Sequence, residues 1–393
     1  MIYKNRTIES ILKKSAAQFP ALIVTGPRQS GKTTLLKHLF GKTHRYVSLD
    51  NPDIRLMAVN EPELFLENYK PPVIIDEAQY APGLFSYLKI LIDANRSRNG
   101  QFLLTGSQSF PLMAGVSESL AGRIAVFTLL SFSVKEQMKE TPLTYDQIRR
   151  VSLRGGYPDL VVHKSKDAKI WFNSYLQTYL ERDVRQLRQV GDLNDFQRFL
   201  ELLASINGCV LNLSTLSHDL GVSVNTVKAW VSVLEASHQI VLIKPFYKNK
   251  GKRITKSPRV YFLDTGFLCF LNGWYSKEQI LKGPLAGQFF ENIVLGEILR
   301  GFYYKGELPR VYWWRTSHGE EVDFIVEREG KILPIEVKMT SRINKGLAKG
   351  LESFCRLFRD EVKQGILVNL SSEEIKIADK IISMPFGKFV KRV

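Results

Sequence analysis

The sequence predicts an α/β fold that begins with an open sheet and crossover helices and ends with a second α/β region. Three observations lead to this prediction. Short apolar runs alternate with helix-like stretches through the first third of the chain, a helix-rich segment follows, and the alternation returns after about residue 285. Alternating strands and helices build parallel sheets, because each crossover helix carries the chain back to the same edge.

The strands expected in the first sheet are short apolar runs suited to burial on both faces. They cover residues 21–25, 45–49, 73–75, 102–105 and 124–129. Helices are expected between them, including residues 32–40 and 84–96.

The remaining chain divides by its pattern. After about residue 135 the pattern is helical, with an early break at GGYP, residues 155–158. Residues 210–265 indicate helix, turn, helix and hairpin, and from about residue 285 a helix precedes two strands and an α/β tail. We therefore expect four units, namely the sheet in residues 1–135, a helical lid or linker in 136–209, a helix–turn–helix module in 210–265 and a C-terminal α/β domain in 266–393.

Composition limits the protein class. At 393 residues the chain can hold about two or three domains, and 44% hydrophobic with 24% charged residues is typical of globular proteins. No apolar run approaches the ~18 residues of a membrane span, and the first residues lack a signal-peptide pattern. The cysteines at 209, 269 and 355 lie too far apart to predict a disulfide framework or a zinc cluster. We expect a reducing, cytoplasmic compartment.

The chain is basic, with 55 Lys and Arg against 39 Asp and Glu and a net charge of +16. A basic surface favours polyanionic partners, nucleic acid first. Part of this charge is local, in the run KNKGKRITK at residues 248–256. The alternative is a basic protein whose scattered charge is only solvated.

A glycine-rich stretch directly follows the first expected strand. Residues 26–33, GPRQSGKT, match G-x-x-x-x-G-K-[ST] between a strand and a helix. Such a loop turns backbone N–H groups toward a phosphate, and the helix start adds the positive end of its dipole. In this pattern Lys32 reaches the β- and γ-phosphates and Thr33 binds Mg²⁺. The stretch predicts a nucleoside triphosphate site.

Two acids end the third expected strand, in PPVIIDEAQ. Asp76 is placed to hold Mg²⁺ with Thr33. Glu77 is suited to polarise the attacking water, which favours hydrolysis over binding alone. The alternative is a pair of ordinary surface carboxylates.

Further polar residues follow the next strands. Thr105 and Ser107, in FLLTGSQ, are expected beside the γ-phosphate, the usual place for a sensing residue. Arg123, in SLAGRI, is a candidate for neutralising charge in the transition state, in cis or from a neighbouring subunit of a homo-oligomer. A surface ion pair is the equal alternative for Arg123.

These motifs together resemble the AAA+ class of P-loop ATPases, and more narrowly the prokaryotic ATPases that join an AAA+ domain to a C-terminal module of unassigned function. The resemblance rests on GPRQSGKTT, VIIDEAQ, LTGSQS, LAGR, GGYP, YLERDV and EVDFIV…IEVK, from about residue 20 to 340. It implies ATP and Mg²⁺ as cofactors, a nuclease-like fold at the C-terminus, and a nucleotide site with Asp76, Glu77 and a loop of Gly26, Pro27, Arg28, Gln29, Ser30, Gly31, Lys32, Thr33 and Thr34.

Residues 214–243 have the rhythm of a helix-turn-helix, and a following hairpin would make it a winged helix. Gly221 makes the turn and Ser223 caps the second helix. The side chains expected to face the core are Leu216, Leu220, Val227, Trp230, Val231 and Leu234.

DNA contact by this module is one of two interpretations. The second helix exposes Asn225, Thr226 and Lys228 but no arginine that could bind guanine. These residues give weak support for sequence-specific recognition of bases. The basic wing suits phosphate contact better, through Lys248, Lys250, Lys252, Arg253 and Lys256. The alternative is a winged helix that packs on protein. Arg182 and Arg185, on the preceding helix, are candidates for the nucleotide site or an intersubunit contact.

Acids and a lysine gather in VDFIVEREGKILPIEVK, residues 322–338, which predicts two strands around a charged turn. By strand alternation Glu336 and Lys338 share one face, and the turn brings Asp323 within reach. Glu291 lies on a helix that precedes them. The arrangement resembles that of PD-(D/E)xK nucleases, which implies Glu291, Asp323 and Glu336 as ligands of Mg²⁺ or Mn²⁺ and Lys338 beside the attacking water. A salt-bridged polar surface is the alternative.

The expected function is a Mg-dependent ATPase that couples ATP binding and hydrolysis to a conformational change, acting on nucleic acid and not in a membrane. Two alternatives stay open. One is an ATP-regulated, metal-dependent endonuclease, and the other is a regulatory or scaffolding ATPase with a protein partner.

Overall fold

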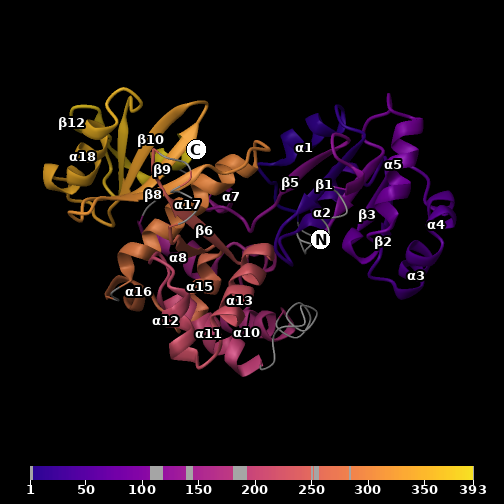
Figure 1. Ribbon diagram of the computed structural model, residues 1–393, viewed down its shortest axis with the longest axis horizontal. Coiled ribbons are helices and arrows are strands. Elements are labelled where there is room, and N and C mark those ends of the chain that lie inside the picture. Colours follow the sequence, from indigo (N-terminus) through magenta and orange to yellow (C-terminus); the bar gives the residue numbers. More distant parts are fainter. Residues whose placement is uncertain are drawn as a thin grey trace.

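The computed structural model describes residues 3–106, 118–138, 145–179, 193–248, 251, 256–282 and 285–392. Figure 1 shows an N-terminal sheet with its helices, a helical region and a C-terminal sheet, with helix α17 (Ala286–Tyr303) near the centre of the molecule. No described helix is long and apolar enough to cross a membrane.

The N-terminal sheet confirms the predicted open α/β architecture. Its five strands are parallel and lie in the order β2-β3-β4-β1-β5. Each strand begins at its predicted residue and ends within one residue of the predicted end. The strands are β1 (Ala21–Thr25), β2 (Arg45–Ser48), β3 (Val73–Asp76), β4 (Phe102–Thr105) and β5 (Ile124–Thr128).

Helices cover both faces of this sheet. Ala21 and Ile23 of β1 join one apolar cluster, while Leu22 and Val24 join the other, because successive side chains of a strand point to opposite faces. The first cluster packs on α3 (Pro52–Asn60), α4 (Pro62–Asn68) and α5 (Leu84–Ala94), and the second on α1 (Glu9–Ala16) and α2 (Lys32–Phe40). Burial on both faces explains the nearly continuous apolar sequence of these strands.

The helical region connects the two sheets. It consists of α7 (Val134–Gln137), α8 (Tyr145–Arg154), α9 (Pro158–Val162), α10 (Ala168–Tyr179), α11 (Leu193–Ser205), α12 (Leu213–Leu220) and α13 (Val224–Ala236). The turn between α12 and α13 has the features that the sequence predicts. Gly221 has a φ of +70°, and the Ser223 hydroxyl accepts a hydrogen bond from the Thr226 amide at 3.0 Å. The six predicted core residues of this pair of helices are buried.

The hairpin after α13 belongs to a larger sheet. Strands β6 (Ile240–Pro245) and β7 (Arg259–Phe262) are antiparallel, and β6 also pairs in parallel with β8 (Val311–Arg315). An eight-stranded mixed sheet results, in the order β12-β13-β11-β10-β9-β8-β6-β7. The expected boundary between residues 265 and 266 is thus crossed by strand pairing, and the division into four units stays a prediction.

The C-terminal sheet is also covered on both faces. Helices α17 and α19 pack on one face and α18 on the other. Its other strands are β9 (Glu321–Arg328), β10 (Lys331–Val337), β11 (Gly365–Asn369), β12 (Ile375–Ala378) and β13 (Ile381–Pro385). The remaining helices are α15 (Thr265–Leu271), α16 (Lys277–Lys282), α18 (Lys349–Leu357), α19 (Phe386–Arg392) and the short 3₁₀ helices η1 (Ala78–Tyr80) and η4 (Lys345–Ala348).

Candidate nucleotide site

The predicted phosphate loop joins the end of β1 to the start of α2. Gly26 has a φ of +139°, and a Cβ at this position would lie 2.1 Å from the carbonyl oxygen of Leu129. Gly31 has a φ of +93° and precedes the first residue of α2. Both glycines of the motif thus adopt a backbone conformation that other residues rarely reach, and Gly26 also leaves no room for a side chain.

Lys32 is buried against this loop. Its ammonium donates hydrogen bonds to the carbonyl oxygens of Gly26 at 3.0 Å and Pro27 at 2.8 Å. The positive charge is therefore held beside the segment that is predicted to receive phosphate.

The Asp76 carboxylate accepts hydrogen bonds from three hydroxyl groups. The hydroxyl of Thr33 donates to Oδ1 at 2.8 Å, and that of Thr105 donates to the same oxygen. The Tyr46 hydroxyl donates to Oδ2 at 2.9 Å. The two predicted Mg²⁺ ligands are thus neighbours, with Thr33 in the first turn of α2 and Asp76 at the carboxyl end of β3. One carboxylate with a hydroxyl fits Mg²⁺, which completes its six oxygens with water and substrate phosphates.

Glu77 immediately follows β3 in a left-handed conformation, with a φ of +56°. Its amide donates to the Thr105 hydroxyl at 3.2 Å, and its carboxylate accepts a hydrogen bond from the Gln79 side-chain amide. Glu77 lines the same cleft as Lys32 and Thr33. The turn therefore places the predicted water-activating carboxylate beside the phosphate loop.

This cleft is open and has a volume of about 710 Å³. One wall is the phosphate loop with Glu77, and the other comes from α9 and α10, through Pro158, Asp159, Tyr175 and Thr178. The Tyr175 hydroxyl accepts a hydrogen bond at 3.0 Å from the side chain of Gln239, at the start of the hairpin after α13. The opposite wall is thus fixed to the helix–turn–helix region. The volume of the cleft lies in the range of small-ligand sites.

A second cavity of about 260 Å³ adjoins the first and shares Gly31, Thr34, Pro158 and Asp159 with it. Its other lining combines the aromatic and aliphatic side chains of Tyr3, Leu35, Phe132 and Val162 with the polar ones of Lys4, Arg6 and His163. Ser30 also lines it, and the Ser30 hydroxyl is buried without a hydrogen-bond partner among the described residues. The two cavities together offer a polar compartment beside a less polar one.

Sequence reasoning missed several of these residues. Tyr46 stands one strand away from Asp76, and only the register of β2 against β3 brings the two together. Pro158 and Tyr175, on the opposite wall of the cleft, follow the phosphate loop by more than a hundred positions. The GGYP break was the only signal that pointed to this segment.

Two other candidates have different positions. Arg123 precedes β5, at the amino edge of the sheet, whereas the phosphate loop leaves the carboxyl edge. Its guanidinium pairs with both carboxylate oxygens of Asp93, at 2.8 and 2.9 Å. This is the surface ion pair named as the alternative, and it leaves no contact between Arg123 and its own phosphate loop. Ser107 lies outside the described residues, as do Arg182 and Arg185.

The basic run that the sequence predicts as a wing is described only in part. Lys248 is exposed and forms an ion pair with Glu361 at 3.1 Å, and Lys256 is exposed. Lys250, Lys252 and Arg253 lie outside the described residues. On α13, Asn225 and Lys228 are exposed, as expected.

The structure brings the four C-terminal candidates together. Register pairs Ile335 with Phe324, so Asp323 and Glu336 are neighbours on β9 and β10. The three carboxylates of this group contact hydrogen-bond or ion-pair donors of the protein itself. The Lys338 ammonium lies 2.6 Å from Glu336, the Val337 amide donates to Asp323 at 2.8 Å, and the Tyr261 hydroxyl donates to Glu291 at 3.3 Å.

Burial dominates the electrostatics of this acidic cluster. Burial and the Asp323 charge raise the pKa of Glu291 to about 8, and the same two causes raise the pKa of Glu336 well above its usual value. Burial also raises the pKa of Asp323. Among the described residues, no group of three or more His, Cys, Asp or Glu side chains could hold a metal ion. The metal site predicted from Glu291, Asp323 and Glu336 is therefore not supported.

Family models match three successive segments of the chain. Residues 18–138 match a model described as AAA domain. Residues 145–278 and 286–389 match two models described as Domain of unknown function, DUF8612 and DUF4143 respectively.

The chain is similar over nearly its whole length to uncharacterized proteins of Mycobacterium tuberculosis and Mycobacterium bovis. Each is 29% identical over 388 residues, which covers 98% of this chain and 84% of the relative.

Among solved structures, the Walker-type ATPase of Pyrococcus abyssi has a TM-score of 0.46 at 16% identity, covering 69% of this chain and 96% of its own. The Thermotoga maritima RuvB Holliday junction branch migration motor has a TM-score of 0.30 at 14% identity, covering 61% and 89%. From the matched AAA domain and the loop geometry, we conclude that the chain carries a P-loop, AAA-like ATPase domain, followed by two regions similar to domains of unknown function.

Proposed function

We propose that the protein binds MgATP in the cleft between the phosphate loop and helices α9 and α10, and hydrolyses it there. One observation carries the proposal. The Thr33 hydroxyl lies 2.8 Å from the Asp76 carboxylate, and Thr33 lines the same cleft as Lys32 and Glu77. A hydroxyl, two acids and a lysine around a phosphate loop are the groups that phosphoryl transfer to water requires.

The residues divide the chemistry among them. Lys32 turns from the loop carbonyls to the β- and γ-phosphates and offsets their charge. Thr33 and Asp76 hold Mg²⁺, which supplies positive charge to the phosphate oxygens. Glu77 orients a water molecule in line with the γ-phosphorus and accepts its proton. Thr105, bonded to Asp76, fixes the carboxylate.

The second cavity suits the nucleobase. It adjoins the phosphate loop through Gly31 and Thr34, and Tyr3, Leu35, Phe132 and Val162 give part of its lining an apolar surface for a planar heterocycle. The N-terminal segment and α9 would then contact the base while α10 faces the phosphates. Nucleotide in the site would bridge the sheet and the helical region.

The test is phosphate release by purified protein with MgATP. We expect Glu77→Gln to lower turnover about 100-fold or more while ATP binding persists, because general bases contribute about 10²–10⁴ to rate. Glu63→Gln is the matched control, since Glu63 is exposed on α4, away from the cleft lining. Turnover by Glu77→Gln equal to that of the unchanged protein would remove Glu77 from the mechanism.

We further propose that the protein uses ATP hydrolysis to act on nucleic acid, which it contacts through the phosphate backbone. The net charge of +16 and the exposed Asn225 and Lys228 on α13 support this proposal. Backbone contacts predict retention on DNA that falls steeply with salt. ATP turnover stimulated by DNA, unchanged in Asp323→Ala and lost in Lys32→Ala, is the expected result.

Two other outcomes of this assay would select the alternatives. Nicking that requires Mn²⁺ and disappears with Asp323→Ala and Lys338→Ala would establish an ATP-regulated endonuclease. Absence of any retention on DNA at low salt would contradict nucleic-acid action and leave a regulatory ATPase with a protein partner.

A further inference from the structure

Arg6, near the N-terminus, is only 5% exposed, donates to the phosphate loop and also lines the second cavity beside Ser30 and Gly31. Its guanidinium donates to the Ser30 carbonyl at 3.2 Å, to the Leu130 carbonyl at 2.7 Å and to the Tyr304 hydroxyl at 2.9 Å. Its Nε pairs with Glu136 at 3.1 Å. One side chain therefore joins the loop, the segment after β5 and the residue that follows α17.

Glu136 completes this buried network. Its carboxylate accepts hydrogen bonds from the Thr7 amide at 2.8 Å, the Ser133 amide at 2.9 Å and the Tyr304 hydroxyl at 3.1 Å. Burial alone would raise its pKa, but the Arg6 charge and the hydrogen bonds from the Ser133 and Thr7 amides and from Arg6 outweigh burial and lower the pKa. The Arg6–Glu136 pair is therefore ionised in the fold, with its donors and acceptors directed by geometry.

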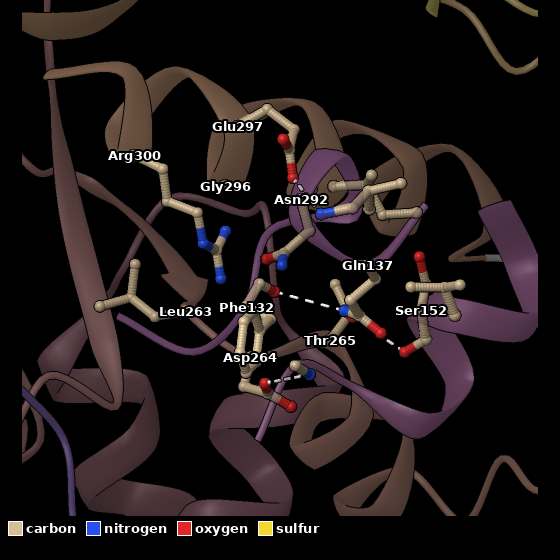
Figure 2. A pocket seen from close by; sticks show the side chains of 14 residues that line it. Phe132, Gln137, Ser152, Leu263, Asp264, Thr265, Asn292, Gly296, Glu297 and Arg300 are labelled. Atoms are coloured by element: carbon tan, nitrogen blue, oxygen red, sulfur yellow. Dashed lines mark hydrogen bonds between the residues drawn. The ribbon is translucent and has the colours of Figure 1, made fainter. Parts of the chain in front are cut away.

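Helix α17 holds the same segment at two more points. Arg300 donates to the Ser131 carbonyl at 3.0 Å and to the Ser131 hydroxyl at 3.1 Å. Glu297 accepts a hydrogen bond from the Val134 amide at 2.7 Å. Figure 2 shows Glu297 and Arg300 projecting from this helix, with Phe132 of the segment below them. The end of α17 is thus fastened to the chain that follows β5.

Helix α17 packs along the C-terminal sheet, and its first turns reach the acidic cluster there. Glu291, in the second turn of the helix, belongs to the acidic cluster of β9 and β10. Thirteen positions separate Glu291 from Tyr304, about 20 Å along a helix at 1.5 Å per residue. One helix therefore runs from the Arg6–Glu136 network to the acidic cluster of the C-terminal sheet.

We propose that Arg6 is a positioning residue of the phosphate loop, and that its bond to Tyr304 transmits nucleotide occupancy to α17. The inference rests on the proposed nucleotide site. When Lys32 turns to a phosphate, it gives up its bonds to the Gly26 and Pro27 carbonyls. The loop then rearranges, and the Ser30 carbonyl is the loop atom that Arg6 holds. The change reaches α17 through the Tyr304 hydroxyl.

Hydrogen exchange of the full-length protein, with and without a slowly hydrolysed ATP analogue and Mg²⁺, tests the link. We expect saturating nucleotide to slow exchange in residues 296–304 about fivefold or more, the lower end of measured site-to-site couplings. Tyr304→Phe keeps the buried ring and removes only the hydroxyl, so the slowing should fall below about twofold. Tyr303→Phe is the matched control, because the Tyr303 hydroxyl has no hydrogen bond to Arg6 or Glu136, and it should retain the full effect.

Binding of the analogue is measured in the same samples. If the unchanged protein does not bind it, the proposed function fails and the inference with it. If the protein binds the analogue but α17 is not protected, or protection survives in Tyr304→Phe, the inference alone is overturned.

A second variant tests the positioning role. Arg6→Lys keeps the charge beside Glu136, but one ammonium cannot reproduce the fork that reaches Ser30, Leu130 and Tyr304. We expect KM for ATP to rise about fivefold while kcat stays within about twofold, because Lys32 and Glu77 are untouched. A general loss of structure would differ from this result, because it would also lower kcat and the circular dichroism signal of the folded protein. An unchanged KM would overturn the positioning role.

Discussion

At the scale of single residues, the candidate site depends on groups whose partners come from distant parts of the chain. The Asp76 carboxylate accepts hydrogen bonds from the hydroxyls of Thr33, Tyr46 and Thr105, which lie on three different elements. Burial and the Asp76 charge raise the pKa of Tyr46 to about 12, so its hydroxyl stays a donor at neutral pH. The carboxylate is thereby oriented before any cation arrives, which lowers the cost of ordering it on binding.

His238 gives a prediction about pH at this scale. Its ring lies in the turn after α13 with a φ of +55°, and its Nε2 is buried without a hydrogen-bond partner among the described residues. Burial, with a smaller effect of the Lys32 charge, lowers the pKa of His238 to about 4. The unfolded chain therefore takes up a proton near pH 6.5 while the folded chain does not, so stability falls as pH drops from about 6.5 to about 4.

Replacing His238 with asparagine removes this titration and tolerates the positive φ. We expect urea unfolding of His238→Asn to lose part of the fall in unfolding free energy between pH 6.5 and pH 4. His218→Asn is the control, because His218 is exposed on α12. Identical pH profiles for the unchanged protein and His238→Asn would contradict the account.

At the scale of elements, local signals predicted the N-terminal sheet and its loop. The apolar runs and the Gly26–Lys32 motif each extend over only a few residues, and they sufficed to predict where the strands end. The surroundings of that loop were not predicted, because only tertiary packing brings Arg6 to the loop, Tyr304 to Arg6 and Tyr175 to the opposite wall of the cleft. Strand alternation placed the acids of β9 and β10 side by side and named a salt-bridged surface with Lys338 as the alternative, but it gave no sign of the Val337 and Tyr261 donors.

The acidic cluster gives a prediction at this scale. Glu291 has a pKa raised to about 8, so its contribution to stability is present below its ordinary pKa and is lost as pH rises toward 8. Glutamine mimics the protonated form. We expect Glu291→Gln to raise the free energy of unfolding at pH 9 by about 1 kcal/mol or more, since each pKa unit corresponds to about 1.4 kcal/mol.

The comparison is made by chemical denaturation at pH 5 and pH 9. The gain should shrink at pH 5, where Glu291 is protonated in the native fold. Lower stability of Glu291→Gln at pH 9 would show that the ionised carboxylate is favourable in the fold and would contradict the electrostatic description.

At the scale of the whole molecule, the three regions share structural elements. The hairpin after α13 joins the C-terminal sheet, α10 is bonded to that hairpin through Tyr175 and Gln239, and α17 meets the phosphate loop through Tyr304 and Arg6. A nucleotide bound between the loop and α10 would therefore contact two regions at once. Such an arrangement suits a protein whose regions respond together to ATP.

Arg123 gives a prediction at this scale. It lies at the edge of the sheet opposite the phosphate loop and pairs with Asp93, so it cannot reach a nucleotide bound to its own subunit. We expect Arg123→Ala to change ATP turnover less than about twofold in a monomer, within the range of surface ion pairs. In an oligomer, loss of turnover that returns on mixing with Lys32→Ala subunits would assign Arg123 to a neighbouring site. Loss of turnover in a proven monomer would contradict the placement.

The most direct measurement is the equilibrium dissociation constant for ATP, with and without Mg²⁺, for the unchanged protein and for Lys32→Ala. We predict that the protein binds ATP, that Mg²⁺ tightens binding, and that Lys32→Ala weakens it about tenfold or more, because charge-assisted hydrogen bonds contribute about 1.5–3 kcal/mol. Equal affinity of the two proteins for MgATP, or no binding by either, would contradict a nucleotide site at the phosphate loop.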